Sequence, residues 1–159
     1  MHTRRTIVTT AAAVALAAPV AAQTGDRAIV DAFYTRFLTS GPHDVAAEGA
    51  RIMDAAFESI GDYSGKSKSR DELIRQIQGF HKLVPDLKWS PEDVIESGNR
   101  YVIRSRASGT PKGPLFGVDG KGKSFTLMSI DIHEVRNGKI VKVYHVEDWA
   151  TALRQLSAQ

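Results

Sequence analysis

A histidine and an aspartate lie on two neighbouring extended segments near the C-terminal end of the chain. Residues 124–146 alternate apolar and polar side chains around an Asn137-Gly138 pair, and Asn-Gly is the strongest short-range signal for a β-hairpin. Asp131 falls on the first predicted strand and His145 on the second. An imidazole can take up and return a proton near neutral pH, and a neighbouring carboxylate fixes its tautomer. The pair therefore predicts general acid/base chemistry, with His145 as the acid/base and Asp131 orienting it.

Whether the two side chains share a face depends on the turn between the strands. If the loop has three residues (136–138), Ser129 lies opposite His145, and Asp131 is a diagonal neighbour of His145 on one face. If the loop has two residues (137–138), His145 leaves the face of Asp131, because a one-residue slip turns every side chain over. We favour the three-residue loop, which collects the polar residues on one surface.

Two other interpretations of the same residues stay open. Ser129, Asp131 and His133 also suit the solvent-facing side of a half-buried sheet. Asp131, His133, His145 and Glu147 form D-x-H and H-x-E patterns whose side chains can bind a divalent cation. Such patterns arise often by chance, and we expect no metal site. No serine or cysteine in a nucleophile motif accompanies the pair, which favours proton transfer or water activation over covalent catalysis.

Apolar residues elsewhere in the chain are candidates for the wall of a binding pocket. Leu115 and Phe116 lie in a loop rich in glycine and proline, where exposure to water is unfavourable. We expect them to cover the mouth of the pocket, with packing under the sheet edge as the alternative. Trp89 and Tyr144 are aromatic wall candidates, and Ser129 is expected on the face of the acid/base pair. This set predicts a hydrophobic small-molecule ligand.

The composition is that of one ordinary globular domain. The chain has 159 residues, of which 42% are hydrophobic and 25% are charged, enough for a substantial core. It contains no cysteine, which excludes disulfides, thiolate metal sites and a lipid anchor attached to cysteine.

The first 22 residues read as a secretory signal peptide, which makes residues 23–159 the single folded domain. A short basic start precedes an apolar run too short to span a bilayer, and small residues end at Ala22. The Arg4-Arg5 pair resembles a twin-arginine export signal, with an ordinary signal peptide as the alternative. Removing both arginines leaves 21 − 2 = 19 basic against 18 acidic residues, or +1. We therefore expect an exported protein, periplasmic or secreted, with no nucleic-acid partner and no membrane anchor.

Periodicity and capping signals predict helices first and strands later, which indicates the α+β class. The expected helices are one from Asp26 to about Thr39, one capped by Asp44 with Met53, Ala56, Phe57 and Ile60 as its inner stripe, one opened by a Ser69/Glu72 capping box, and a short one after Asp148. The expected strands are residues 87–96 with Pro91 as an edge or bulge, residues 101–108, and the hairpin.

Five short motifs occur in one order along the chain. They are Val84-Pro-Asp-Leu, Gly98-Asn-Arg-Tyr-Val-Ile-Arg, Gly113-Pro-Leu-Phe-Gly-Val, Ser129-Ile-Asp-Ile-His and Asn137-Gly-Lys-Ile-Val. With them, residues 28–156 resemble the ester cyclase branch of the SnoaL-like polyketide cyclases. The resemblance implies the nuclear transport factor 2-like fold, a cone in which a curved antiparallel sheet and helices on its concave side enclose a cavity. It also implies a homodimer and no cofactor.

The resemblance bears on function as well. Studied members close a ring in an aromatic polyketide ester by intramolecular aldol chemistry, using an aspartate on the last strand and a histidine on its neighbour. Here His145 occupies the aspartate position and Asp131 the histidine position, so the pair is exchanged, and Val143-Tyr144 replaces a frequent His-Trp. We expect a cofactor-independent acid/base enzyme that cyclises, isomerises or hydrolyses a small hydrophobic carbonyl, ester or lactone compound. The alternative is an exported, non-catalytic protein that binds such a ligand.

Overall fold

The computed structural model describes residues 20–158, with side chains from residue 25. The predicted signal peptide, residues 1–22, lies outside the described residues except for the backbone of its last three. Within the described part of the chain, no helix is both long and apolar enough to cross a membrane.

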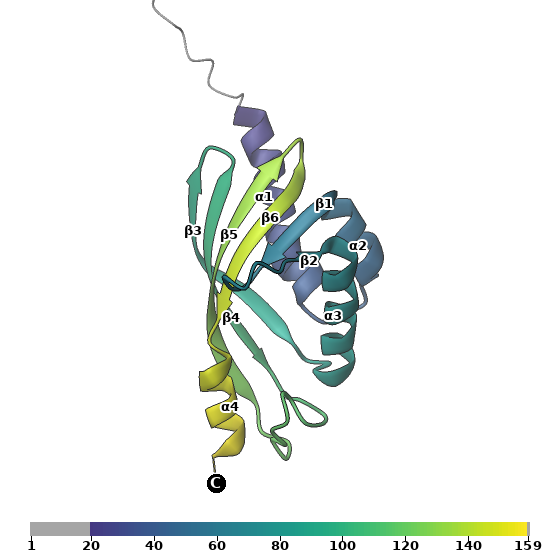
Figure 1. The fold of residues 1–159 in the computed structure, drawn as a ribbon, viewed down its shortest axis with the longest axis vertical. Helices are drawn as coiled ribbons and strands as arrows, with labels where there is room; N and C mark the ends of the chain where they lie inside the picture. The colour runs from purple at the N-terminus through teal and green to yellow at the C-terminus, as the bar shows by residue number, and fades with distance from the viewer. Residues whose placement is uncertain (1–19, 159) are drawn as a thin grey trace, which may run out of the picture.

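Six strands form one curved sheet in the order β2-β1-β6-β5-β4-β3 (Figure 1). The sheet is mixed rather than wholly antiparallel as expected, because β1 and β6 pair in parallel, while the other neighbours pair antiparallel. The strands are β1 (Met53–Ile60), β2 (Lys68–Ser69), β3 (Lys88–Ser97), β4 (Arg100–Gly109), β5 (Phe125–Arg136) and β6 (Lys139–Glu147).

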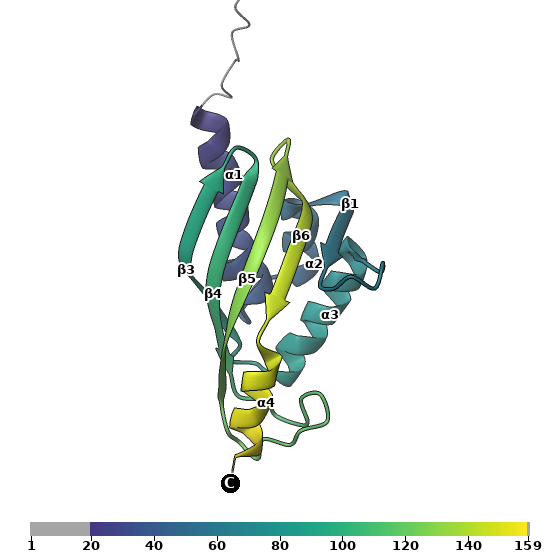
Figure 2. The same ribbon diagram turned by 60° about the vertical axis from the view of Figure 1, so that its left-hand side comes forward.

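The helices cover one face of this sheet. Figure 2 shows β3 to β6 in front, the helices α1, α2 and α3 behind them, and α4 at the lower end of the sheet. The helices are α1 (Val20–Ala32), the π-helix η1 (Phe33–Leu38), α2 (Val45–Ile52), α3 (Arg70–Leu83) and α4 (Trp149–Ser157), which follows β6 directly. This is the expected α+β cone.

Three of the predicted capping residues begin helices, whereas Asp26 lies inside α1 rather than at its start. The Asp44 side chain accepts hydrogen bonds from the backbone N–H groups of residues 46 and 47 at the start of α2. Ser69 and Glu72 form the predicted capping box of α3, and Asp148 accepts from the backbone N–H of Thr151 in α4. These local signals are reliable because each side chain satisfies helix N–H groups that have no partner within the helix.

The prediction that the second helix continues to Ile60 was wrong. The chain leaves the helix at Ile52, and β1 begins at Met53. Met53 and Phe57 are buried as expected, but they belong to a strand that pairs with β6. Strand pairing thus overrides the helical preference of an alanine-rich segment, as tertiary context often does.

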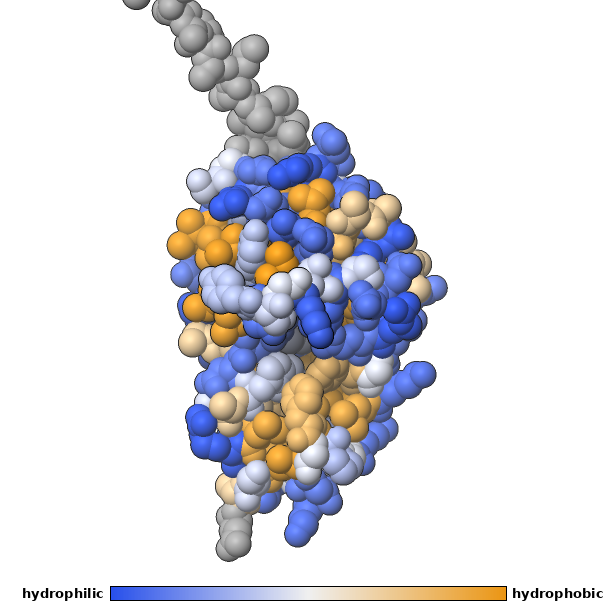
Figure 3. Space-filling model, in the orientation of Figure 1, coloured by the Kyte–Doolittle hydropathy of each residue, from blue (hydrophilic) through white to orange (hydrophobic). Residues whose placement is uncertain are grey.

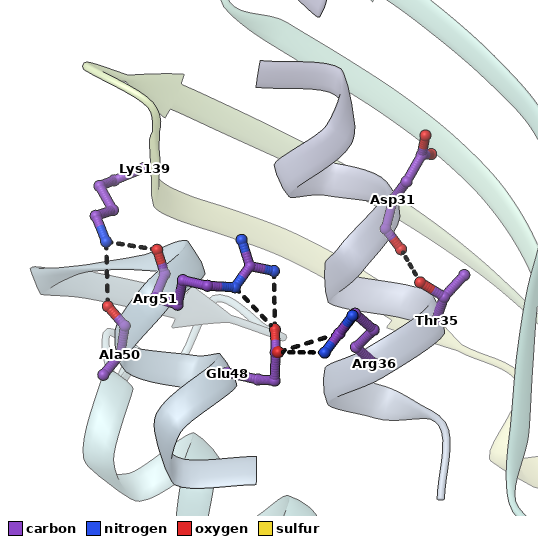
Figure 4. A network of polar contacts seen from close by, with 7 residues as sticks. All are labelled: Asp31, Thr35, Arg36, Glu48, Ala50, Arg51 and Lys139. Carbon is purple, nitrogen blue, oxygen red and sulfur yellow. Dashed lines mark hydrogen bonds and ion pairs between the residues drawn. The ribbon is translucent and has the colours of Figure 1, made fainter. Parts of the chain in front are cut away.

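A polar network fastens α2 at both sides (Figure 4). The Glu48 carboxylate accepts hydrogen bonds from Arg36 of η1, at 3.0 Å, and from Arg51 of its own helix. The Lys139 ammonium, at the start of β6, donates to the carbonyl oxygens of Ala50 and Arg51. These last carbonyls of α2 have no partner within the helix, so Lys139 caps the helix where the chain turns into β1.

The hairpin between β5 and β6 has a different turn from the one we favoured. Asn137 and Gly138 both have positive φ, 51° and 68°, and Arg136 pairs with Lys139, which defines a two-residue turn of type I′. The register then shifts beside Val135, where β6 has one more residue than β5 and forms a β-bulge. The bulge reverses the effect of the shorter turn. Asp131 and His145 therefore share a face, as expected, but as a directly opposed pair rather than as diagonal neighbours.

Candidate active site

The polar face of β5 points into the protein. Ser129, Asp131 and His133 are 1%, 4% and 0% exposed, so the interpretation of this face as the solvent side of the sheet was wrong. The helices pack on this face, and a carboxylic acid and an imidazole are therefore removed from water among apolar neighbours. Buried groups of this kind need hydrogen-bond partners to be tolerated.

Asp131 finds its partners on a helix and on its own strand. Its Oδ2 accepts a hydrogen bond from the Tyr34 hydroxyl at 2.7 Å and another from the Ser129 hydroxyl at 3.1 Å. Ser129 in turn lies 2.8 Å from the Ser105 hydroxyl on β4. No hydrogen bond joins Asp131 to His145 in the described part of the chain, which corrects the expectation that Asp131 orients the imidazole.

Burial sets the ionisation of Asp131. It raises the pKa of this carboxyl from its ordinary value of 3.8 to about 6, against the opposing effect of the Tyr34 hydrogen bond and with a further rise from the charge of Glu147. Burial likewise raises the pKa of Tyr34 well above 10, so that its hydroxyl stays protonated. A carboxyl with a pKa near the working pH is suited to taking up and releasing a proton.

His133 lies deeper and is neutral. Its Nε2 is 2.8 Å from the Tyr34 hydroxyl oxygen, and the Phe33 ring meets the imidazole edge-on with centroids 4.9 Å apart. Burial, with a smaller effect of the charge on His145, lowers the pKa of His133 to about 3. The second ring nitrogen, Nδ1, is buried and has no hydrogen-bond partner among the described residues.

His145 has Glu147 as its acidic partner. Its Nδ1 lies 3.1 Å from Glu147 Oε1, although the N–H does not point at the oxygen, so the contact is an ion pair rather than an aligned hydrogen bond. This pairing raises the pKa of His145 above 6.5, against the opposing effect of burial. The other carboxylate oxygen of Glu147 accepts from the Trp149 indole N–H at 3.4 Å. An imidazolium near neutral pH can donate a hydrogen bond to a developing oxyanion.

Asp131, His145 and Glu147 line one cavity between the sheet and α3. The volume that the centre of a water-sized sphere can reach inside it is about 70 Å³. Most of the wall is apolar, and the other polar groups on it are Ser59, Lys68 and Gln76. The apolar lining residues are Phe33, Leu38, Leu73, Ile77, Phe80, Leu87, Trp89, Phe116, Val143 and Trp149.

Three aromatic rings meet on the cavity wall away from the strands. Trp149 stacks on Phe80 with centroids 5.6 Å apart, and Phe116 meets Trp149 edge-on at 5.2 Å. Figure 3 shows apolar surface between α4 and the lower end of α3, the elements that carry Trp149 and Phe80. Phe116 has a φ of 48° and is 59% exposed, so the turn holds its ring partly in water beside the other two.

The other predicted binding residues lie in different places. Trp89 and Phe116 line the cavity, whereas Leu115 is buried and is not part of the cavity wall. Ser129 is buried against Asp131 rather than on the cavity wall. Tyr144 is 38% exposed on the outer face of the sheet. It cannot contact a ligand in the cavity, because neighbouring residues of a strand point to opposite sides and His145 points inward.

The sequence interpretation missed two residues of the site. Tyr34 lies in the segment predicted to be helical from Asp26 to about Thr39. A buried tyrosine hydroxyl nearly always needs a partner, and this was the available signal. From the sequence, Glu147 is considered only within the H-x-E pattern, whereas the structure places it on β6 facing His145. Within the described residues, no group of three or more histidine, cysteine or acidic side chains is arranged to hold a metal ion.

Solved structures share this fold. The chain matches a protein from Jannaschia sp. CCS1 assigned to the SnoaL-like polyketide cyclases, with a TM-score of 0.73 and 20% identity over 86% of this chain and 94% of that one. IdmH from Streptomyces antibioticus, assigned as a polyketide cyclase, matches with a TM-score of 0.72 and 21% identity over 84% and 99%. A protein from Bacillus cereus assigned as a polyketide cyclase reaches 0.68 and 25% over 84% and 80%.

A search of curated proteins found no match to this chain. The model of one family does match, over residues 28–156, which is most of the chain. That span includes the whole sheet, the Asp131 and His145 pair and the aromatic cluster. The protein therefore belongs to the family of SnoaL-like polyketide cyclases.

Proposed function

We propose that the protein is a cofactor-independent acid/base enzyme that moves a proton next to a carbonyl group of a small hydrophobic compound. Asp131 acts as the base that removes a proton from carbon, and His145, paired with Glu147, donates a hydrogen bond to the carbonyl oxygen as it becomes an enolate. The observation that carries the proposal is one apolar cavity holding a carboxyl with a pKa of about 6 opposite an imidazole whose pKa is raised. Enolate formation is the first step shared by aldol cyclisation and isomerisation.

This assignment differs from the sequence-based expectation, in which His145 is the acid/base and Asp131 orients it. Asp131 is the more deeply buried group, and its Oδ2 accepts two hydrogen bonds, so its carboxyl is oriented without help from His145. The imidazole has its own carboxylate partner, which favours the protonated form. The pKa values of the Asp131 carboxyl and the His145 imidazole are both raised. A proton-transfer pair requires two such groups, which can gain or lose a proton near neutral pH.

A probe reaction tests the proposal without the natural substrate. The ketone 2-tetralone exchanges its α-hydrogens for deuterium in D₂O through its enolate, and ¹H NMR follows the loss of signal. We expect the full chain to accelerate the exchange, Asp131→Asn to slow it about 100-fold or more, and His145→Gln to slow it about 10- to 100-fold.

Matched controls separate this role from general effects of the substitutions. Asp62→Asn and His43→Gln change the same residue types at sites outside the cavity and should leave the exchange rate unchanged. Exchange no faster than in free solution, or equal rates in all variants, would contradict the proposal. If 2-tetralone raises the melting temperature without exchanging, the alternative of a non-catalytic binding protein is favoured.

We further propose that the protein acts after export, on the evidence of its first 22 residues alone, and that it is a homodimer. The outer face of the sheet supports the second point. Its exposed apolar side chains are Ile95, Met128, Ile130, Tyr144 and Val146, with exposed fractions between 38% and 70%. A second copy of the same face would remove this apolar surface from water.

A further inference from the structure

Two chains of hydrogen bonds converge on one oxygen of Asp131. Tyr34 links His133 to Oδ2 from the helix side, and Ser129 links Ser105 to it from the sheet side. All five side chains are buried. Of these five residues, the proposed reaction uses only Asp131. The four other polar groups call for an explanation, because burying a polar group is unfavourable unless it is hydrogen-bonded.

The direction of the first chain follows from counting hydrogens. A tyrosine hydroxyl has one hydrogen to donate. If Tyr34 donates it to the Asp131 carboxylate, the hydroxyl oxygen accepts from His133, which must then carry its hydrogen on Nε2. Nδ1 is left as a lone pair without a partner, as its surroundings show.

The opposite direction is less favourable. It requires Asp131 to donate to Tyr34 and Tyr34 to donate to His133 Nε2, which moves the imidazole hydrogen to Nδ1. A buried N–H without an acceptor would result, and such orphaned donors are rare in proteins. In the second chain, Ser129 donates to Asp131, so the hydrogen between the two serines must come from Ser105.

We propose that Tyr34 and His133 are positioning residues, which hold Asp131 Oδ2 as a permanent hydrogen-bond acceptor and leave Oδ1 to exchange the proton with substrate. No hydrogen bond to Oδ1 is formed within the described part of the chain. The inference rests on the proposed function of Asp131, but the chain of donors can be measured without any substrate. The chain of donors holds the Asp131 carboxylate in one orientation, and the hydrogen bond from Tyr34 limits the basicity of that carboxylate.

NMR on the wild-type full chain gives the first test. In ¹⁵N-histidine-labelled protein, His133 should be the neutral Nε2–H tautomer at every pH from about 5 to 8, because its pKa is lowered far below this range. An Nδ1–H tautomer, or a His133 that titrates in this range, would overturn the assigned direction. This measurement needs no variant and is therefore independent of any folding defect.

Substitutions give the second test, read from the side-chain ¹³C titration of Asp131. Tyr34→Phe keeps the ring but removes a donor to the carboxylate, and should raise the pKa of Asp131 by about one to two units. His133→Leu should raise it by less, and His133→Gln, which can still donate to the Tyr34 oxygen, should restore it. The other ionisable groups on the cavity wall, His145, Glu147 and Lys68, are unchanged in these variants.

Tyr144→Phe on the outer face is the matched control and should leave the pKa of Asp131 unchanged. An unchanged pKa in Tyr34→Phe, or equal effects of His133→Leu and His133→Gln, would refute the positioning role. Failure of the proposed function would look different: the pKa shifts would occur as described, but 2-tetralone would not exchange.

Discussion

The two faces of the sheet differ in a way that neither side chain polarity nor strand pattern alone explains. On β5, Ser129, Asp131 and His133 face the interior, while Met128 and Ile130 face outward and are 53% and 47% exposed. In most half-buried sheets the apolar side is inside. Here polar residues of the inner face lie on or behind a cavity wall, and the outer face keeps exposed apolar side chains. A pattern of alternation therefore shows that a strand has two kinds of face, but not which of them is enclosed.

The buried carboxylate of Asp131 on the inner face should destabilise the native state, and the proposed activity requires this carboxylate. Because the folded-state pKa of Asp131 is about 6 and its unfolded value is 3.8, the native state loses stability as the pH rises through about 6. At pH 7 the loss amounts to about 3 kcal/mol, and it is absent below about pH 4. Asp131→Asn should therefore stabilise the protein at pH 7 and hardly at all near pH 4, as measured by urea unfolding at both pH values. An Asn variant that is less stable at pH 7 would show that the charge is well compensated and would break the contrast between the faces.

A charged side chain placed on the outer face should weaken dimer formation rather than lower the stability of the folded chain. Val146 is 70% exposed on the outer face, and Val146→Lys would place like charges across the proposed dimer contact. We expect the dimer to dissociate about 100-fold more readily, with 2-tetralone exchange by the monomer unchanged or only slightly reduced. Analytical ultracentrifugation measures the first and NMR the second.

Gln78→Lys, on the exposed side of α3, is the control for Val146→Lys and should not affect assembly. A wild-type protein that is monomeric at all concentrations would remove the proposed role of the outer face.

The smallest effect is expected behind His145, where the inner face meets the end of β1. A Cβ at Gly61 would lie 3.0 Å from Cε1 and 3.1 Å from Nε2 of the imidazole. Gly61→Ala should shift the ring by a few tenths of an ångström, lower the pKa of His145 as the Glu147 contact loosens, and slow exchange roughly threefold. A histidine NMR titration checks the pKa.

The control for Gly61→Ala is Gly79→Ala in α3, where a Cβ meets nothing within 4 Å. It should leave His145 unchanged. Equal titrations of His145 in both variants would show that Gly61 does not constrain the imidazole.

Local signals predicted the parts of the fold that depend on a few neighbouring residues. Asp44 and Ser69 cap helices because each satisfies N–H groups within three positions of itself. Tyr34 was beyond such reasoning, since its partner Asp131 is 97 residues away. The shared face of Asp131 and His145 was predicted for the wrong reason. A two-residue turn and a β-bulge together place the two side chains on the same side of the sheet, as the expected three-residue loop would have done.

The sequence by itself determined the family, the starts of α2, α3 and α4, the hairpin and the presence of an acid and an imidazole on adjacent strands. Only the tertiary structure decided that the polar face is enclosed, that Glu147 rather than Asp131 pairs with His145, and that Tyr34 and His133 stand behind the carboxylate. The physical reason is that helix caps and turns are satisfied by adjacent groups, whereas desolvation depends on which distant elements pack over a side chain. A carboxyl with a pKa of about 6 is a property of that packing.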